Sequence, residues 1–220
     1  MCGRFNVTDD PLVQGLMEGL GMPLYPRPRS NVAPGSTAEF VLDDGGGRQL
    51  LEGVWSLLIE PHPSGPGYRP NPKFKTFNAR SDRLTSSPLW KRVYPKQRCI
   101  VPMSAFHEWR DGQVYNIHPE GEAIAMAGLW QRYRNGDDEL LSFTTITLPP
   151  HERFAHIHDK SIPLMLRPAD FDAWLDPHFH NVDAFQGLMR SHIPAALVCQ
   201  PVRSPKDLEP VGAAEVIPAD

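Results

Sequence analysis

Proline is the sequence feature that most restricts the fold of this chain. The 220 residues include 24 prolines. Because proline lacks a backbone N–H and its ring clashes with the preceding helical turn, it interrupts helices and is tolerated in sheets only at edges and bulges. The chain must therefore be built from many short elements joined by turns.

Between the turns, apolar residues form short runs that favour strands. Strands are expected at 38–42, 50–58, 75–79, 100–101, 105–109, 114–117, 123–130, 140–148, 162–166 and 196–202. Helices are expected from Asp10-Pro11 to Gly21, after Ser87-Pro88, and over 167–175 and 182–189. Residues 60–72 hold five prolines and are expected to form a loop. This pattern predicts a single α+β domain over residues 1–220, with a mixed, mostly antiparallel barrel-like sheet and flanking short helices.

The composition is typical of a globular protein in a reducing compartment. Hydrophobic residues make up 40% of the chain and charged residues 22%. Cys2, Cys99 and Cys199 are too few and too scattered for a disulfide framework. The sequence has neither an apolar signal-peptide core nor a run of about 18 apolar residues that would span a membrane. We therefore expect a cytoplasmic protein without a membrane partner.

Basic residues are concentrated in one segment of an otherwise acidic chain. The net charge is −4, yet residues 69–98 carry nine Lys and Arg side chains and a single acid, Asp82. A groove that follows a phosphate backbone requires such a local excess of positive charge, so the segment predicts a nucleic-acid surface. The alternative is a solvated basic face that binds no ligand.

The N-terminus carries an unusual pair of reactive groups. Aminopeptidases remove Met1 readily when a small residue follows, so the mature chain is expected to begin at Cys2. Its α-amine, with a pKa of about 8, and its thiol, with a pKa of about 8.5, then form a 1,2-aminothiol. Such a pair can form a Schiff base with an aldehyde and close a thiazolidine, or attack an acyl group with the amine as base. The alternative is an ordinary small residue at a frayed terminus.

The segment 75–80 carries polar groups at strand spacing. Strand periodicity puts Thr76, Asn78 and Arg80 on one face. An amide there can orient an amine or a hydroxyl, and a guanidinium can bind a phosphate with two hydrogen bonds. An ordinary solvent-facing strand has the same pattern.

The segment 105–109 carries a carboxyl group in apolar surroundings. Glu108 shares a strand face with Phe106, and loss of hydration there would raise its pKa and suit it to move protons. A structural ion pair with an arginine is the alternative. Trp109 can stack on a base or belong to the core.

Residues 155–163 bring together two imidazoles, an acid and a cation. His156 and His158 alternate with an isoleucine, and His151 lies close by in sequence. Neither a Cys-x-x-Cys nor a His-Glu-x-x-His motif accompanies them, so we expect a single histidine that acts as acid or base and no metal site.

Taken together, these segments resemble the SOS response-associated peptidase (SRAP) family. The resemblance covers most of the chain and rests on motifs in a fixed order: Met1-Cys2-Gly3-Arg4-Phe5, Asn31-Val32-Ala33-Pro34-Gly35, Phe77-Asn78-Ala79-Arg80, Arg98-Cys99-Ile100-Val101-Pro102, Phe106-His107-Glu108-Trp109, Ala127-Gly128-Leu129-Trp130 and Ile157-His158-Asp159-Lys160-Ser161-Ile162-Pro163. The family fold is a mixed α/β domain around a barrel-like sheet. In that family the cysteine at position 2 links covalently to the aldehyde of an abasic site in single-stranded DNA and shields it from strand breakage.

The resemblance implies a role for each matching residue. Cys2 is the nucleophile, and Asn78 positions its amine or the oxygen derived from the aldehyde. Glu108 moves protons as the sugar ring opens and the Schiff base cyclises, while His158 assists Schiff-base chemistry and crosslink reversal. Contacts with DNA are implied for Gly3, Arg4, Arg80, Trp109, Thr147 and Lys160. The implied protein is a monomeric, cofactor-free enzyme of the DNA damage response, with Cys-dependent peptidase and lyase-like Schiff-base activity on abasic sites in single-stranded DNA at the nucleoid.

Three departures from the family pattern bear on DNA binding. Lys160-Ser161-Ile162-Pro163 stands where Arg-Met-Pro is usual, so a second phosphate clamp becomes a point charge. The loop over 60–72, whose only aromatic residue is Tyr68, replaces a loop with a tryptophan that wedges against bases. Residues 201–211 lack the usual Val-Asn.

Two other classes of function remain open. An N-terminal-nucleophile amidohydrolase also begins Met-Cys-Gly, but it needs a downstream Asn-His-Arg-Gly type of signature that this chain lacks. A non-catalytic single-strand binding module would keep the basic segment and survive loss of Cys2. Autoproteolysis at residue 1, which the family name suggests, would be a maturation step.

Overall fold

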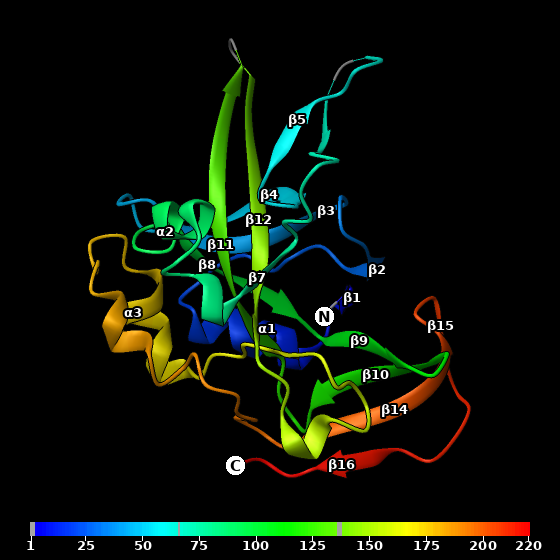
Figure 1. The fold of residues 1–220 in the computed structure, drawn as a ribbon. Helices are drawn as coiled ribbons and strands as arrows, with labels where there is room; N and C mark the ends of the chain where they lie inside the picture. The colour runs from blue at the N-terminus through cyan, green and yellow to red at the C-terminus, as the bar shows by residue number, and fades with distance from the viewer. Residues whose placement is uncertain (1–2, 66, 136–137) are drawn as a thin grey trace.

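The computed structural model describes residues 3–65, 67–135 and 138–220, and within these ranges one sheet closes into a barrel. Its strands are β3 (Thr37–Asp43), β4 (Arg48–Trp55), β8 (Arg98–Met103), β11 (Ile124–Asn135) and β12 (Asp138–Leu148). The barrel is closed because β11 and β12, at the two ends of the order β11-β8-β3-β4-β12, also pair with each other (Figure 1). Two short strands, β7 (Asn78–Arg80) and β13 (Ile162–Pro163), pair with β12.

A second, open sheet lies beside the barrel. Its order is β15-β14-β10-β9-β1-β2, and β16 also pairs with β14 (Figure 1). Its strands are β1 (Arg4–Val7), β2 (Arg29–Val32), β9 (Ala105–Arg110), β10 (Gln113–Pro119), β14 (Leu197–Ser204), β15 (Asp207–Pro210) and β16 (Glu215–Ile217). The chain passes from β8 of the barrel to β9 of this sheet through Ser104 alone, so the two sheets meet where β9 begins.

The helices are short, as the prolines predict. They are α1 (Pro11–Gly19), α2 (Pro88–Val93) and α3 (Phe171–Leu175), with 3₁₀ turns η1 (Ser81–Arg83), η2 (Glu152–Phe154), η3 (Pro168–Asp170) and η4 (Val182–Phe185). The expected start of the first helix is confirmed, since the Asp10 carboxylate accepts hydrogen bonds from the N–H groups of Leu12 and Val13. The helix expected over 167–175 is divided between η3 and α3, and that over 182–189 shrinks to η4. In the described part of the chain, no helix is long and apolar enough to cross a membrane.

Aromatic side chains hold the barrel and the second sheet together. The Trp55 ring lies 4.9 Å from that of Phe5 on β1 and 6.5 Å from that of Phe143 on β12. Its Nε1–H donates to the backbone carbonyl of Phe77 at 2.8 Å, which fixes the chain just before β7. Where β11 passes β12, a Cβ at Gly128 would lie 2.5 Å from the Thr144 carbonyl, so only glycine fits.

The prediction of an α+β fold around a barrel-like sheet is confirmed, but residues 60–72 do not form a plain loop. They include most of a hairpin, β5 (Ile59–Pro61) paired with β6 (Tyr68–Pro70). The Glu60 carboxylate accepts hydrogen bonds from Arg69 at 2.7 Å and from the Asn71 amide at 3.0 Å. Polar cross-strand contacts, which proline counts do not reveal, therefore stabilise extended chain here.

The expected strand over 75–79 begins later, at Asn78. Thr76 lies before it and is buried, with its hydroxyl 3.1 Å from that of Ser56 and accepting from the N–H of Leu58 at 2.9 Å. The prediction that Thr76 shares a strand face with Asn78 and Arg80 is therefore wrong. Its hydroxyl instead ties this segment to residues 56–58, which lie about 20 residues earlier in the chain. The strand expected over 162–166 is likewise short, and ends at Pro163.

One member of the basic segment is structural. Arg98 is 2% exposed, and its guanidinium donates to backbone carbonyls of five residues at 2.6–3.0 Å: Tyr94, Pro95, Trp174, Asp176 and Phe179. Arg98 therefore fastens the end of α2 and the region after α3 to the barrel, and it is not available to a phosphate.

Candidate functional site

The parallel pairing of β7 with β12 positions Asn78 and Arg80. Asn78 lies opposite Thr145, and Arg80 lies opposite Thr147. The Thr145 hydroxyl donates to Asn78 Oδ1 at 2.5 Å, which fixes the orientation of the buried amide and turns its NH₂ group away from Thr145. β7 therefore presents an oriented amide and, two residues further on, an exposed guanidinium.

Glu108 and His158 form a buried pair, although 50 residues separate them in sequence. Glu108 is 1% exposed on β9, and His158 is 8% exposed in the segment after η2, where its N–H bonds the Phe154 carbonyl. His158 Nδ1 lies 3.4 Å from Glu108 Oε2. The alternative of an arginine partner fits less well, because the nearby Arg110 binds Asp159, at 2.7 Å.

Burial shifts the pKa values of the pair in opposite directions. Burial raises the pKa of Glu108 to about 7, although the positive charge of Lys160 partly opposes this. Burial also lowers the pKa of His158 to about 4, and Lys160 acts in the same direction. At neutral pH the imidazole is therefore uncharged, and the carboxyl is divided between its two protonation states. A group in that condition can both donate and accept a proton.

β1 begins beside this pair. Arg4 is the register partner of His107, the residue before Glu108, and its guanidinium donates to the carbonyl of Gly3 at 2.6 Å. Cys2 lies outside the described residues. Gly3 and Arg4 thus lie where the chain enters the second sheet next to Glu108, and their contacts with DNA stay predictions.

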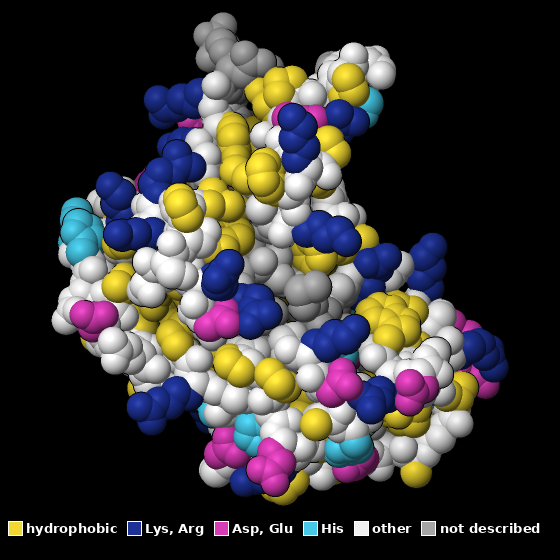
Figure 2. All heavy atoms as spheres, in the orientation of Figure 1, with side chains coloured by type: hydrophobic (Ala, Val, Ile, Leu, Met, Phe, Trp, Pro, Cys, Tyr) yellow, Lys and Arg dark blue, Asp and Glu magenta, His cyan; other side chains and the backbone are white. Residues whose placement is uncertain are grey.

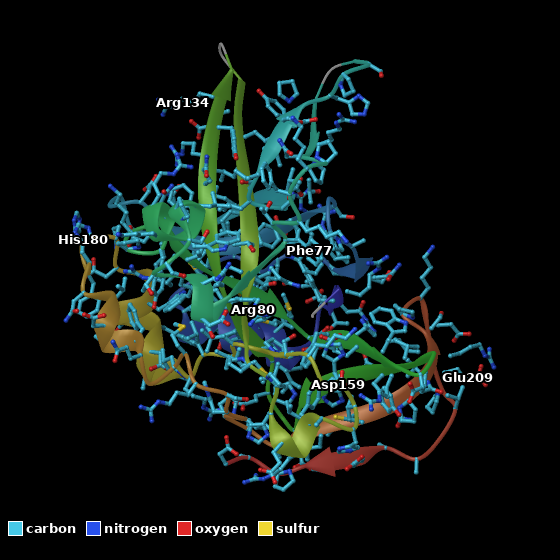
Figure 3. The ribbon with its side chains drawn as sticks, viewed as in Figure 1. Phe77, Arg80, Arg134, Asp159, His180 and Glu209 are labelled. Atoms are coloured by element: carbon cyan, nitrogen blue, oxygen red, sulfur yellow. The ribbon has the colours of Figure 1, made fainter. Side chains whose placement is uncertain are left out.

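A cavity of about 450 Å³ brings together three of the six predicted DNA contacts. Arg80, Thr147 and Lys160 line it together. Figure 3 labels Arg80 in the central part of the face, and Figure 2 shows Lys and Arg side chains around this region. Lys160 connects the cavity to the acid–base pair, because its charge acts on both Glu108 and His158.

Trp109 lies at the edge of the site. Its side chain is 40% exposed, so it is not a core residue, and its backbone hydrogen-bonds His158. The open aromatic surface lies one residue from Glu108 and can stack on a base.

Other charged side chains lie at the site, for which the sequence suggested no role. Asp82 binds Arg80 through two hydrogen bonds, of 3.0 and 2.6 Å, and the position of an acid two residues after an arginine was the available signal. Arg110 binds Asp159, which Figure 3 labels on the same face as Arg80. That contact joins β9 to the segment after η2 and could not be read from spacing.

The histidines do not gather into a metal site in the described part of the chain. No group of three or more His, Cys, Asp or Glu side chains there is arranged to hold a metal ion. His156 instead lies 2.8 Å from the Glu215 carboxylate, and His151 lies 3.2 Å from that of Asp220.

Comparison with known proteins identifies a family that matches this chain. A family model described as SOS response associated peptidase (SRAP) matches residues 1–205. The abasic site processing protein YoqW of Bacillus subtilis is 28% identical over 231 residues, covering 96% of this chain and 97% of its own length. The abasic site processing protein HMCES of Xenopus tropicalis is 27% identical over 187 residues, covering 68% of this chain and 54% of its own.

Solved structures share the fold. A protein from Bordetella bronchiseptica superposes with a TM-score of 0.70 at 21% identity, covering 92% of this chain and 100% of its own. A phage-related protein from the same organism gives 0.68 at 25% identity, covering 94% and 100%.

Proposed function

This chain belongs to the SOS response-associated peptidase family, and from that premise we propose that it captures abasic sites in single-stranded DNA through Cys2. Its relatives include proteins named for abasic site processing, which supports DNA containing abasic sites as the target. The proposed product is a covalent DNA–protein crosslink in which the aldehyde carbon of the lesion belongs to a thiazolidine ring.

The proposed reaction has two steps that balance without a cofactor. The α-amine of Cys2 adds to the aldehyde carbon and water leaves, which gives a Schiff base. The thiol then adds across the C=N bond, with sulfur bonding the carbon and its proton passing to nitrogen. Removal of Met1 must come first, because only an N-terminal cysteine has both groups.

In this proposal the Glu108–His158 pair transfers the protons. Opening of the sugar ring and loss of water both need a proton donor, and addition of the thiol needs an acceptor. Glu108, with its pKa raised by burial to about 7, can supply both roles at neutral pH. The neutral His158 beside it can exchange protons with it. The oriented Asn78 amide would hold the amine or the oxygen derived from the aldehyde.

In this proposal the cavity, together with Trp109, binds the DNA. Arg80 and Lys160 would bind backbone phosphates, Thr147 would line the path, and Trp109 would stack on a neighbouring base. A flexible single strand can present its sugar without the cost of opening a duplex. Holding the aldehyde against Cys2 makes capture effectively intramolecular, which can lower the barrier by about 7 kcal/mol or more.

The observation that carries this proposal is the buried Glu108–His158 pair beside the strand that begins at Arg4. The direct test is incubation with an abasic single-stranded oligonucleotide, followed by heating and denaturing electrophoresis. Wild-type protein should give a heat-stable adduct and Cys2→Ala none. A binding module would bind equally well without Cys2 and form no adduct, whereas an amidohydrolase would release ammonia from glutamine. Equal adduct from both proteins would refute the proposal.

A further inference from the structure

The cavity described above contains one acidic side chain among its basic ones. Residues from η1, the end of β7, the end of β12 and residues 160–161 line it. Its lining residues are Arg80, Ser81, Asp82, Thr147, Leu148, Pro149, Pro150, Lys160 and Ser161. Figure 2 shows an acidic side chain against the basic ones near the centre of this face.

Two buried hydroxyl groups in the cavity lack partners. Thr147 is 2% exposed and Ser161 is 5% exposed, and neither hydroxyl has a hydrogen-bond partner among the described residues. A buried hydroxyl without a partner is costly, so such groups are usually satisfied by a ligand or by water. Beside the cation of Lys160, two hydroxyl donors fit a ligand that carries several acceptor oxygens and a negative charge. A phosphodiester is such a ligand.

The Arg80 guanidinium, which would complete this phosphate site, is already bound to the Asp82 carboxylate. Arg80 Nε lies 3.0 Å from Asp82 Oδ1, and Nη2 lies 2.6 Å from Oδ2. This two-bond arrangement uses the same fork of N–H groups that a phosphate would use. Both side chains are exposed, at 67% for Arg80 and 47% for Asp82, so the pair is screened by water and can be exchanged.

We propose that Asp82 is an intramolecular competitor for the phosphodiester that Arg80 binds. This rests on the DNA-binding part of the proposed function. In the free protein Asp82 holds the Arg80 fork, and a phosphate seated against Lys160, Thr147 and Ser161 displaces it. No covalent bond changes, because one pair of hydrogen bonds is exchanged for another. A phosphate that touches Arg80 alone gains little from the exchange, so Asp82 favours strands seated in the cavity over loosely held ones.

The test measures reversible binding of an undamaged single-stranded oligonucleotide by fluorescence anisotropy. Asp82→Asn should bind about fivefold more tightly than wild type, the upper range expected for releasing an exposed ion pair. Asp207→Asn is the matched control, because it removes the same charge from a similar exposed ion pair. Asp207, at 45% exposure, binds Arg203, at 58% exposure, with a distance of 2.9 Å. The control should change affinity by less than about twofold. In an Arg80→Gln background, the gain from Asp82→Asn should disappear.

The hydroxyl groups have a separate test. Ser161→Ala should weaken oligonucleotide binding about threefold, the loss of a single hydrogen bond. It should leave the melting temperature of the free protein unchanged or raised, since the hydroxyl has no partner among the described residues. If Ser161 had only a structural role, Ser161→Ala would lower the melting temperature and leave oligonucleotide binding unchanged.

Three outcomes would overturn the proposal: Asp82→Asn binding no more tightly than Asp207→Asn, Asp82→Asn binding less tightly than wild type, or a gain that persists without Arg80. Weaker binding would mean that Asp82 positions Arg80 for DNA. The oligonucleotide has no aldehyde, so the result does not depend on crosslinking. A protein that passes this test but forms no adduct would refute the crosslinking proposal alone.

Discussion

His158 Nδ1 lies 3.4 Å from Glu108 Oε2, in a contact between β9 and the segment that follows η2. Both side chains are buried, and burial moves the pKa of Glu108 up and that of His158 down. The pair therefore carries a mobile proton near neutral pH without carrying two opposite full charges. That property connects the fold to the proposed chemistry.

Glu108→Gln tests the proton-transfer role. Loss of a general acid–base group should slow adduct formation by about 100-fold or more. Because the pKa of Glu108 is about 7, the wild-type rate should lose its acid-catalysed contribution above pH 7, and Glu108→Gln should lack that dependence. Single-turnover rates between pH 5.5 and 9 measure both effects. A variant with the wild-type rate and pH profile would exclude Glu108 from the reaction.

The same substitution should stabilise the protein at alkaline pH. Glu108 has a folded-state pKa above its ordinary value of 4.5, so the folded state binds the proton more tightly than the unfolded state. Ionisation of Glu108 therefore lowers the free energy of unfolding as the pH rises from about 4.5 to about 7. Glutamine does not ionise, so the variant does not lose this stability. At pH 8 Glu108→Gln should be more stable by on the order of 3 kcal/mol, with little difference below pH 4.5.

Urea unfolding at pH 4.5 and pH 8 measures this change. Glu215→Gln is the control, because Glu215 is an exposed partner of His156. The prediction fails if Glu108→Gln gains nothing relative to that control at pH 8.

Thr145→Val tests the orientation of Asn78. The substitution removes the hydroxyl that donates to Asn78 Oδ1 while keeping the volume of the side chain. We expect adduct formation about tenfold slower and a stability loss of about 1–2 kcal/mol, because a buried acceptor loses its donor. Thr144→Val is the matched control, since Thr144 is equally buried but its hydroxyl donates to a backbone carbonyl, that of Thr145, at 3.4 Å. Equal rates for the two variants would show that the amide needs no such support.

Arg98→Lys tests the structural role of the buried guanidinium. Lysine has three donors, so at least two of the five carbonyls that Arg98 satisfies would lose theirs. The free energy of unfolding should fall by about 3 kcal/mol. Arg92→Lys, at an exposed arginine bonded to Gln131, should change it by less than about 0.5 kcal/mol. Oligonucleotide affinity per folded molecule should stay unchanged for Arg98→Lys, and a selective loss of affinity would assign Arg98 to DNA instead.

The fold class was predictable from the sequence, because prolines and short apolar runs leave few alternatives to a sheet built of short strands. The first helix was predictable for a local reason, the Asp10 cap. The hairpin of β5 and β6 was not, since it depends on Glu60 contacts with Arg69 and Asn71 across the turn. Composition could not separate Arg98, which the fold buries, from Arg80, which it exposes.

The sequence suggested individual residues of the candidate site, whose roles stay predictions, but not how they are arranged. Glu108 was singled out because an apolar strand face desolvates a carboxyl, and its pKa is raised for that reason. Its pairing with His158 depends on long-range packing, as does the sharing of one cavity by Arg80, Thr147 and Lys160. Asp82 was visible in the sequence only as the single acid of a basic segment.

Crosslinking through Cys2 is measured by the intact mass of the protein after incubation with an abasic single-stranded oligonucleotide. We expect a chain that begins at Cys2 and an adduct whose mass equals protein plus oligonucleotide minus one water. Proteolysis should locate the link on the N-terminal peptide, and Cys2→Ala should give none. An adduct attached at another residue, or wild-type protein that begins at Cys2 and stays unmodified, would show that Cys2 does not capture the abasic site.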